Sequence, residues 1–235
     1  MLRNILEYYN DELFLIYSNN KKPIIIFDLI AIKTIKIIEN VHYDFIINLH
    51  HYLDTIEITD LILSVSYDND IKLWNYINFE YLLDIKNINE NWSMNLICLI
   101  KVNNEYYIFS GDSNFGNCEP IKIFNLNGNK IKVINDSNYS TNNIDIFYVN
   151  NLNTNFIIIL NDKCCRSYDF DKIEIYHKYY DNDNKSHYSI IMNYKNEKIV
   201  KLIESSIDGI IRIWNFHSGE LLNKVNINKK CFSIC

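Results

Sequence analysis

The amino-acid sequence predicts an all-β protein built from repeated four-stranded units. Its composition is the first reason: of 235 residues, 43 are Ile and 37 are Asn, against one Ala, five Gly and two Pro. Branched and aromatic side chains suit a pleated sheet and lose rotamer freedom in a helix. Hydrophobic residues make up 48% of the chain, which is enough to bury a core and excludes a disordered or fibrous protein. The second reason is a short pattern that recurs at a regular period.

The charge pattern excludes several classes of partner. The net charge is −6, the sequence pI is near 5.5, and no run of Lys or Arg exceeds two residues. A nucleic-acid-binding surface needs a basic patch, so we expect no direct contact with nucleic acid. No apolar run reaches the ~18 residues that cross a bilayer, so we expect no membrane insertion. Charged residues interrupt the first 17 residues, so this segment does not resemble a secretory signal. We therefore expect an intracellular protein, cytoplasmic or nuclear, with reduced cysteines.

The recurring pattern is clearest in two segments, Leu61–Asn75 and Lys201–Asn215. Each contains a Ser, one further residue, an Asp, five residues and then Trp-Asn. An aromatic residue followed by Asn or Asp also ends an apolar run at three other places. The five aromatic residues are Phe27, Trp74, Phe124, Tyr168 and Trp214, spaced by 47, 50, 44 and 46 residues. This spacing predicts five structural repeats.

Apolar runs and turn residues divide each repeat into short strands. The expected strands are 4–9, 13–18 and 24–28 in the first repeat, 44–49, 61–66, 71–75 and 81–85 in the second, 95–101, 106–111, 121–125 and 130–134 in the third, and 189–194, 199–205, 210–215 and 220–225 in the fifth. Four strands in about 47 residues, repeated, predict a β-propeller of about five blades, which bury their faces by stacking. The approximate blades are 1–40, 41–90, 91–138, 139–184 and 185–228, in a single domain of residues 1–235.

Two repeats share a further set of residues, three of them polar. They are His42, Ser66, Asp68 and Trp74 in the second repeat, and His187, Ser206, Asp208 and Trp214 in the fifth. With these residues and the spacing of the repeats, the chain resembles the WD-repeat β-propeller family. The resemblance implies that each Asp accepts a hydrogen bond from its His and that Ser and Trp complete a structural network. The first, third and fourth repeats lack the His, and the fourth, with Cys164 and Cys165 in its hairpin region, departs most from the pattern.

The last residues, 229–235, resemble the innermost strand of a further blade. We therefore expect either an open arc of five blades or part of a larger ring, such as one of seven blades.

No motif for catalysis, cofactor binding or a metal site occurs in the chain. The segment 181–186 resembles the opening of a calcium loop but lacks its Gly and its Glu, so we expect a solvated loop. We expect the adjacent His50 and His51 to be exposed at the end of a strand. Cys98 and Cys118 are expected to be buried or partly buried small hydrophobic residues.

These observations favour a non-enzymatic scaffold for protein–protein interaction. The resemblance places partner binding on the face that carries the hairpins, where Tyr43, Tyr67, Tyr188 and Ile207 adjoin the network. Ordinary packing between blades is an equal alternative for these four residues. A five-bladed propeller enzyme such as a glycosidase would need converging carboxylates, and only Asp44 and Asp145 lie near the innermost strands. A subunit of an RNA-processing or trafficking assembly is a further alternative.

Overall fold

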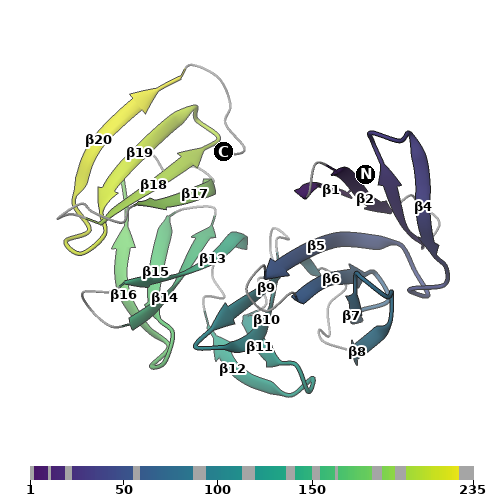
Figure 1. Ribbon diagram of the computed structural model, residues 1–235. Helices are drawn as coiled ribbons and strands as arrows, with labels where there is room; N and C mark the ends of the chain where they lie inside the picture. Colours follow the sequence, from purple (N-terminus) through teal and green to yellow (C-terminus); the bar gives the residue numbers. More distant parts are fainter. Residues whose placement is uncertain are drawn as a thin grey trace. The chain divides into compact units, whose positions relative to one another are not determined.

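The computed structural model describes residues 3–9, 12–18, 23–54, 59–86, 94–112, 120–135, 141–149, 154–161, 164–181, 187–193 and 200–227 (Figure 1). These residues form twenty strands and no helix, which confirms the all-β prediction. The strands make five four-stranded antiparallel sheets. The expected further strand at 229–235 lies outside the described residues.

Each sheet is formed by four consecutive strands, in the order in which they occur along the chain. Sheet 1 contains β1 (Arg3–Tyr9), β2 (Glu12–Ser18), β3 (Ile24–Asp28) and β4 (Lys33–Ile38). Sheet 2 contains β5 (Ile46–Asp54), β6 (Thr59–Ser66), β7 (Ile71–Asn75) and β8 (Tyr81–Ile85). Sheet 3 contains β9 (Met94–Val102), β10 (Glu105–Asp112), β11 (Ile121–Asn125) and β12 (Lys130–Ile134). Sheet 4 contains β13 (Thr141–Val149), β14 (Thr154–Asn161), β15 (Cys165–Asp169) and β16 (Glu174–Tyr179). Sheet 5 contains β17 (His187–Asn193), β18 (Lys201–Ser206), β19 (Ile210–Asn215) and β20 (Leu221–Asn226).

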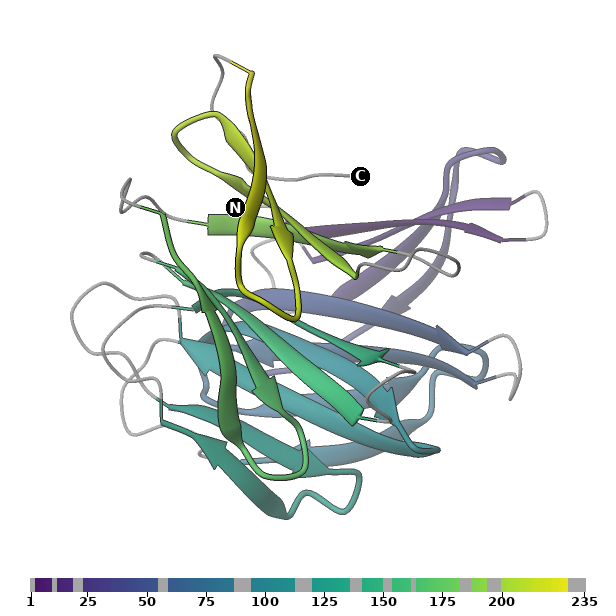
Figure 2. The same ribbon diagram turned by 90° about the vertical axis from the view of Figure 1, so that its left-hand side faces the viewer.

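The contacts within the chain define two compact units. The first comprises Met1–Gly111 with Ile121–Ile131, and the second Asp112–Pro120 with Lys132–Cys235. The strands of each sheet run antiparallel, as Figure 2 shows from a second side. The five sheets lie within the five repeat ranges expected from the sequence.

The Asn or Asp that follows each recurring aromatic residue caps the turn after the third strand. Its side-chain oxygen accepts hydrogen bonds from backbone N–H groups two to four residues later, at 2.8–3.2 Å. The five capping residues are Asp28, Asn75, Asn125, Asp169 and Asn215. Short Asx side chains make this local bond readily, which explains why the repeat keeps Asn or Asp at this position.

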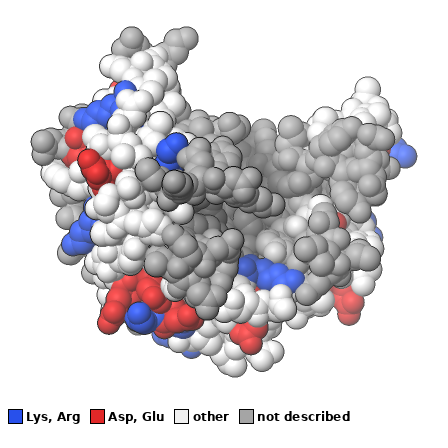
Figure 3. Space-filling view, turned by 60° about the vertical axis from the view of Figure 1, so that its left-hand side comes forward, with Lys and Arg blue, Asp and Glu red and all other residues white. Residues whose placement is uncertain are grey.

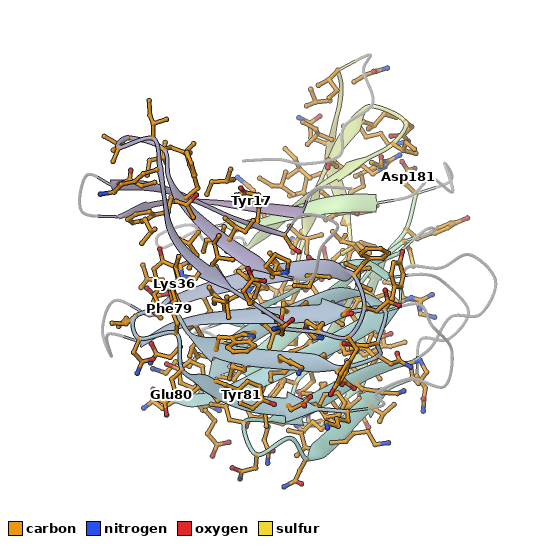
Figure 4. The ribbon with its side chains drawn as sticks, turned by 90° about the vertical axis from the view of Figure 1, so that its right-hand side faces the viewer. Tyr17, Lys36, Phe79, Glu80, Tyr81 and Asp181 are labelled. Atoms are coloured by element: carbon orange, nitrogen blue, oxygen red, sulfur yellow. The ribbon has the colours of Figure 1, made fainter. Side chains whose placement is uncertain are left out.

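Alternating side chains of the strands form separate hydrophobic cores in each unit. In the first unit one cluster joins sheets 1 and 2 around Ile16, Ile26 and Trp74, and another joins sheets 2 and 3 around Leu63 and Phe124. The ammonium group of Lys36 on β4 lies 5.2 Å from the ring centroid of Phe79, which follows β7 (Figure 4). In the second unit a cluster joins sheets 4 and 5 around Phe156, Tyr179, Trp214 and Phe216.

The cysteines of the described segments are free thiols. Cys98, Cys164 and Cys165 are all buried, which confirms the expectation for Cys98. Burial raises the pKa of the Cys165 thiol, and the nearby Glu204 and Cys164 raise it further. Cys118 lies outside the described residues. On the face drawn in Figure 3, positive and negative side chains are interspersed among uncharged ones.

Candidate functional site

One end of sheet 2 holds a chain of polar side chains centred on His42. The Nδ1 atom of His42 lies 3.0 Å and 3.1 Å from the two carboxylate oxygens of Asp68. Its Nε2 atom lies 2.9 Å from Oγ of Ser64, and Nε1 of Trp74 donates to the same oxygen at 3.4 Å. Because an ionised carboxylate can only accept, Nδ1 of His42 carries the proton of its bond. His42, Ser64 and Trp74 are buried, so each polar atom depends on the others.

Asp68 connects this chain to the backbone of two neighbouring segments. Its carboxylate accepts hydrogen bonds from the backbone N–H of Tyr43 at 2.8 Å and of Asp70 at 3.1 Å. Burial by itself would raise the pKa of Asp68, but the bonds from His42, Tyr43 and Asp70 outweigh it and lower the pKa to about 2. The carboxylate is therefore ionised across the physiological range and holds the segment before β5 against the β6–β7 turn.

The serine of this network is not the one expected from the sequence. Ser66 was expected to join His42 and Trp74, but the structure places Ser64 there, while Ser66 accepts a hydrogen bond from the backbone N–H of Asp68 at 3.1 Å. On β6, Ile62 pairs with Trp74, so Ser64 lies two residues along on the same face as the indole. The signal in the sequence is the alternation of side chains along β6: counted from the residue that pairs with Trp74, it places Ser64 on the side of the indole.

Exposed aromatic side chains surround this network. Tyr43 is 82% exposed, Phe45 is 47% exposed and Tyr67 is 43% exposed, and we call these three residues the hairpin patch. The backbone N–H of Tyr67 donates to the carbonyl of Phe45 at 3.1 Å, so their backbones are adjacent. The sequence analysis identified Tyr43 and Tyr67 and missed Phe45, which alternates with Tyr43 just before β5.

A pocket of about 310 Å³ opens beside the hairpin patch. It is lined by Asn40, Val41, His42, Tyr43 and Lys72. The ammonium group of Lys72 lies 3.8 Å from a carboxylate oxygen of Asp84, so its charge is partly balanced within the sheet. The site therefore combines a small recess of mixed polar and apolar lining with exposed aromatic rings at one end of sheet 2.

The fifth repeat builds its polar cluster around an arginine. Arg212 on β19 is almost fully buried and donates to Asp208 at 2.8 Å, to Asp181 at 2.9 Å and to Ser206. Ser206 also donates to Asp208. Burial would lower the pKa of Arg212, but the two aspartates outweigh it and raise the pKa. The hydrogen bonds from Arg212 and Ser206 lower the pKa of Asp208 in turn, despite its burial.

The expected serine, histidine and tryptophan network is accordingly altered in this repeat. The position equivalent to Ser64 is Glu204, which is fully buried opposite Arg212 in the β18–β19 ladder. Nε1 of Trp214 is buried with no hydrogen-bond partner among the described residues, since the hydroxyl that serves Trp74 is missing. The side chains of His187 and Tyr188 lie outside the described residues, and Ile207 is half-buried.

His50 and His51 do not form the exposed pair that the sequence suggested. The strand β5 continues to Asp54, five residues beyond its expected end, so both residues lie inside it. The His51 side chain is 4% exposed and its Nε2 contacts the carboxylate of Asp60, which pairs across the sheet with Leu53. The pKa of His50 is lowered to about 4: burial is the main cause and the neighbouring His51 adds to it, while a hydrogen bond with the Leu99 backbone opposes both.

We predict that His50 makes the protein sensitive to mild acid. Its pKa is lower in the folded chain than the ordinary value of 6.5, so the unfolded chain binds the extra proton. The contribution to stability is complete above pH ~6.5 and is lost as the pH falls toward 4, by about 2 kcal/mol after allowing for contact with water. Urea unfolding between pH 7 and pH 4 measures this loss, and His50→Gln should make the stability curve flatter. An equally steep curve in the variant would contradict the assignment to His50.

Within the described ranges, His, Cys, Asp and Glu side chains form no group of three that could hold a metal ion. In that part of the chain no helix is long and apolar enough to cross a membrane. Most of the calcium-like segment at 181–186 and the side chain of Asp145 lie outside the described residues, while Asp44 is half-buried.

Comparison with known proteins identifies the fold alone. No protein-family model and no curated protein sequence matches the chain. Among solved structures, the chain is similar to the crystal structure of the computationally designed Ika8 protein, with a TM-score of 0.67 and 13% sequence identity. The alignment covers 97% of this chain, and the chain spans 63% of that structure's length. At this identity the similarity concerns the arrangement of strands.

Proposed function

We propose that the chain is a WD-repeat-type β-propeller that serves as a non-enzymatic scaffold for protein partners. The observation that carries the proposal is the hairpin patch of Tyr43, Phe45 and Tyr67, held beside the buried network of His42 and Asp68. The polar network stabilises the fold, and the exposed rings around it make the contacts with a partner.

The propeller arrangement is supported by the regularity of the five sheets. Each has four strands in sequence order, and each third strand ends on an aromatic residue followed by a capping Asn or Asp. A four-stranded sheet with two apolar faces needs a neighbour on each side, which stacked blades supply. The network of His42, Asp68, Ser64 and Trp74 supports the resemblance to the WD-repeat family in the second repeat.

The hairpin patch has the physical properties of an interaction surface. Aromatic side chains are enriched in protein interfaces because a large ring buries much area at little cost in side-chain entropy. The backbone of all three residues is held in place: the N–H of Tyr43 donates to Asp68, and the N–H of Tyr67 donates to the carbonyl of Phe45. A pre-organised surface loses less entropy on binding, so the same contacts produce a higher affinity.

An affinity experiment with matched variants tests this function. Immobilised wild-type chain is exposed to an extract of the cells that make it, and retained proteins are quantified by mass spectrometry. We expect the double variant Tyr43→Ser, Tyr67→Ser to retain a specific partner at least about tenfold less well. The control is Ile77→Ser, because Ile77 is 61% exposed in the β7–β8 turn at the opposite end of the same sheet.

Binding of the purified partner to the three chains then gives dissociation constants for comparison. Equal retention by the wild type and the double variant would contradict the proposal. An equal loss with Ile77→Ser would also contradict it, because the contact would then not be specific to the hairpin patch.

A further inference from the structure

The third strand of four sheets carries a positive side chain two residues before the recurring aromatic residue. Side chains two residues apart on a strand point to the same side, so each cation lies on the aromatic face of its sheet. In sheets 2 and 5 this face packs on the preceding sheet. A charge at such a junction needs a partner nearby, and the partner differs between these two sheets. The four cations are Lys72, Lys122, Arg166 and Arg212.

In sheet 5 the segment that arrives from sheet 4 supplies a carboxylate. The strand β16 ends at Tyr179, and Asp181, two residues later, accepts a hydrogen bond from Nε of Arg212 at 2.9 Å. The same carboxylate contacts the ammonium group of Lys224 on β20. The place beside the third-strand cation is therefore filled by an aspartate side chain that belongs to the chain itself.

The segments that enter sheets 2 and 5 begin in the same register. Ile38, the last residue of β4, pairs with the residue three places before the aromatic residue of sheet 1. Tyr179, the last residue of β16, pairs with the residue three places before the aromatic residue of sheet 4. Asn40 and Asp181 each follow two residues later. Asn40 is therefore the counterpart of Asp181 in the repeat, and it carries no charge.

The second repeat leaves open the place that Asp181 fills in the fifth. Asn40, from the connecting segment, and Lys72, the counterpart of Arg212, both line the pocket of about 310 Å³ described above. We call this pocket the Lys72 recess. It lies at the junction of sheets 1 and 2, inside the first unit, where its lining residue Val41 belongs to the shared core.

The neighbours of Lys72 leave its charge partly unbalanced. Its ammonium group lies 3.8 Å from a carboxylate oxygen of Asp84, and the ammonium group of Lys86 lies 3.7 Å from the same oxygen. One carboxylate oxygen is thus shared by two cations. Asp68 bonds to His42 and not to Lys72. A further carboxylate that entered the recess would meet a cation whose charge is not fully neutralised.

We propose that the Lys72 recess binds the carboxylate of an acidic side chain from a protein partner, in the place that Asp181 takes in the fifth repeat. Lys72 supplies the counter-charge, and the side-chain amide of Asn40 donates a hydrogen bond. The inference rests on the proposed scaffold function and gives the chemistry of the partner. Tyr43 belongs both to the recess and to the hairpin patch, so one partner segment can contact the two together.

The variant Asn40→Asp places the carboxylate of the fifth repeat in the second. Asn40 has a φ of 53°, and Asn and Asp adopt this left-handed backbone more readily than other residues with a side chain. We expect the new carboxylate to pair with Lys72 and to raise the melting temperature by about 1–3 °C. The gain should disappear when Lys72→Met is also present.

The matched control for stability is Asn127→Asp. Asn127 is exposed in the turn between β11 and β12, so the substitution adds the same charge outside the recess. Its effect on the melting temperature should be the same with and without Lys72→Met. An Asn40→Asp variant that gains nothing over this control would overturn the proposal, because the recess would then not favour a carboxylate.

Selection from a random library of displayed peptides tests the partner chemistry. The carboxyl ends of the peptides are fused to the display protein, so only side chains supply a carboxylate. We expect the wild-type chain to enrich peptides with Asp or Glu, and the amide analogue of a selected peptide to bind at least about fivefold less tightly. Asn40→Asp should weaken binding of the acidic peptide to a similar extent, because its own carboxylate fills the recess. Asn127→Asp should bind like the wild type.

The outcomes distinguish this inference from the proposed function. Selected peptides that depend on Tyr43 and Tyr67 but show no preference for acidic residues would contradict the inference and leave the scaffold function standing. Acidic peptides that bind the variant Tyr43→Ser, Tyr67→Ser as well as the wild type would support the recess and contradict the role of the hairpin patch. A library that yields no binding peptide, or an acidic preference that survives Asn40→Asp, would overturn the inference.

Discussion

Replacing Arg212 by Met should lower the free energy of unfolding by about 3–5 kcal/mol. Arg212 is 1% exposed and its guanidinium group bonds to Asp181 and Asp208. Glu204, which lies opposite it in the β18–β19 ladder, is fully buried. Removing one partner of a buried charge cluster leaves the remaining charges uncompensated in a medium where they are poorly solvated. Urea unfolding at neutral pH measures the loss.

Two further variants show whether the loss comes from the buried charges. Adding Glu204→Gln to Arg212→Met should recover at least about 1 kcal/mol, because a neutral side chain no longer needs a counter-charge. The control is Lys172→Ala, which removes an exposed ion pair of 3.5 Å with Asp169 and should cost no more than about 0.5 kcal/mol. The account fails if Arg212→Met is no more destabilising than this control.

Replacing Asp68 by Ala should cost about 3 kcal/mol at neutral pH. The substitution removes the acceptor for His42 and for the backbone N–H groups of Tyr43 and Asp70, and leaves the buried imidazole N–H without a partner. A hydrogen bond to a charged group contributes about 1.5–3 kcal/mol when one partner is deleted from a buried site. Thermal and urea unfolding of the two chains measure the difference.

The pH dependence of the free energy of unfolding distinguishes the effect of the Asp68 charge from the effect of its side-chain shape. Its pKa of about 2 in the folded chain lies below the ordinary value of 3.8, so the unfolded chain binds the proton first as the pH falls. This stabilisation is complete above pH ~4 and is lost as the pH falls through about 2, by about 1–2 kcal/mol after solvent screening.

Asp68→Asn should therefore differ most from the wild type at neutral pH and converge with it toward pH 2. The matched control is Glu80→Gln, since Glu80 is an exposed acid at the other end of sheet 2 (Figure 4). Its substitution should leave the pH profile unchanged. A difference between Asp68→Asn and the wild type that does not vary with pH would show that the carboxylate charge is not the cause.

The strands that the sequence located best are those that end on a strong local signal. The expected bounds of β3, β7, β11 and β19 agree with the structure, because an aromatic residue with a capping Asn or Asp ends each of them. The innermost strands were less well located. The strand β5 continues five residues past its expected end at Leu49, because pairing with β6 extends it through His50 and His51.

The polar sites show the same division between local and long-range signals. The contact between His42 and Asp68 was expected from the resemblance and is present in the structure. Ser64 was missed in favour of Ser66, because the choice depends on the register between β6 and β7. The Arg212 cluster was missed because Asp181 and Asp208 lie 31 and four residues away along the chain and meet only in the folded sheet.

The sequence by itself determined that the protein is all-β, that it contains five repeats, and where the strands β3, β7, β11 and β19 begin and end. These properties depend on side chains that act within a few residues: branched residues in strands, and Asn or Asp at turns. Tertiary structure decided which serine joins His42 and which ions surround Arg212. Those outcomes depend on strand register and on the presence of a neighbouring sheet, so residues far apart in the chain must meet before they are settled.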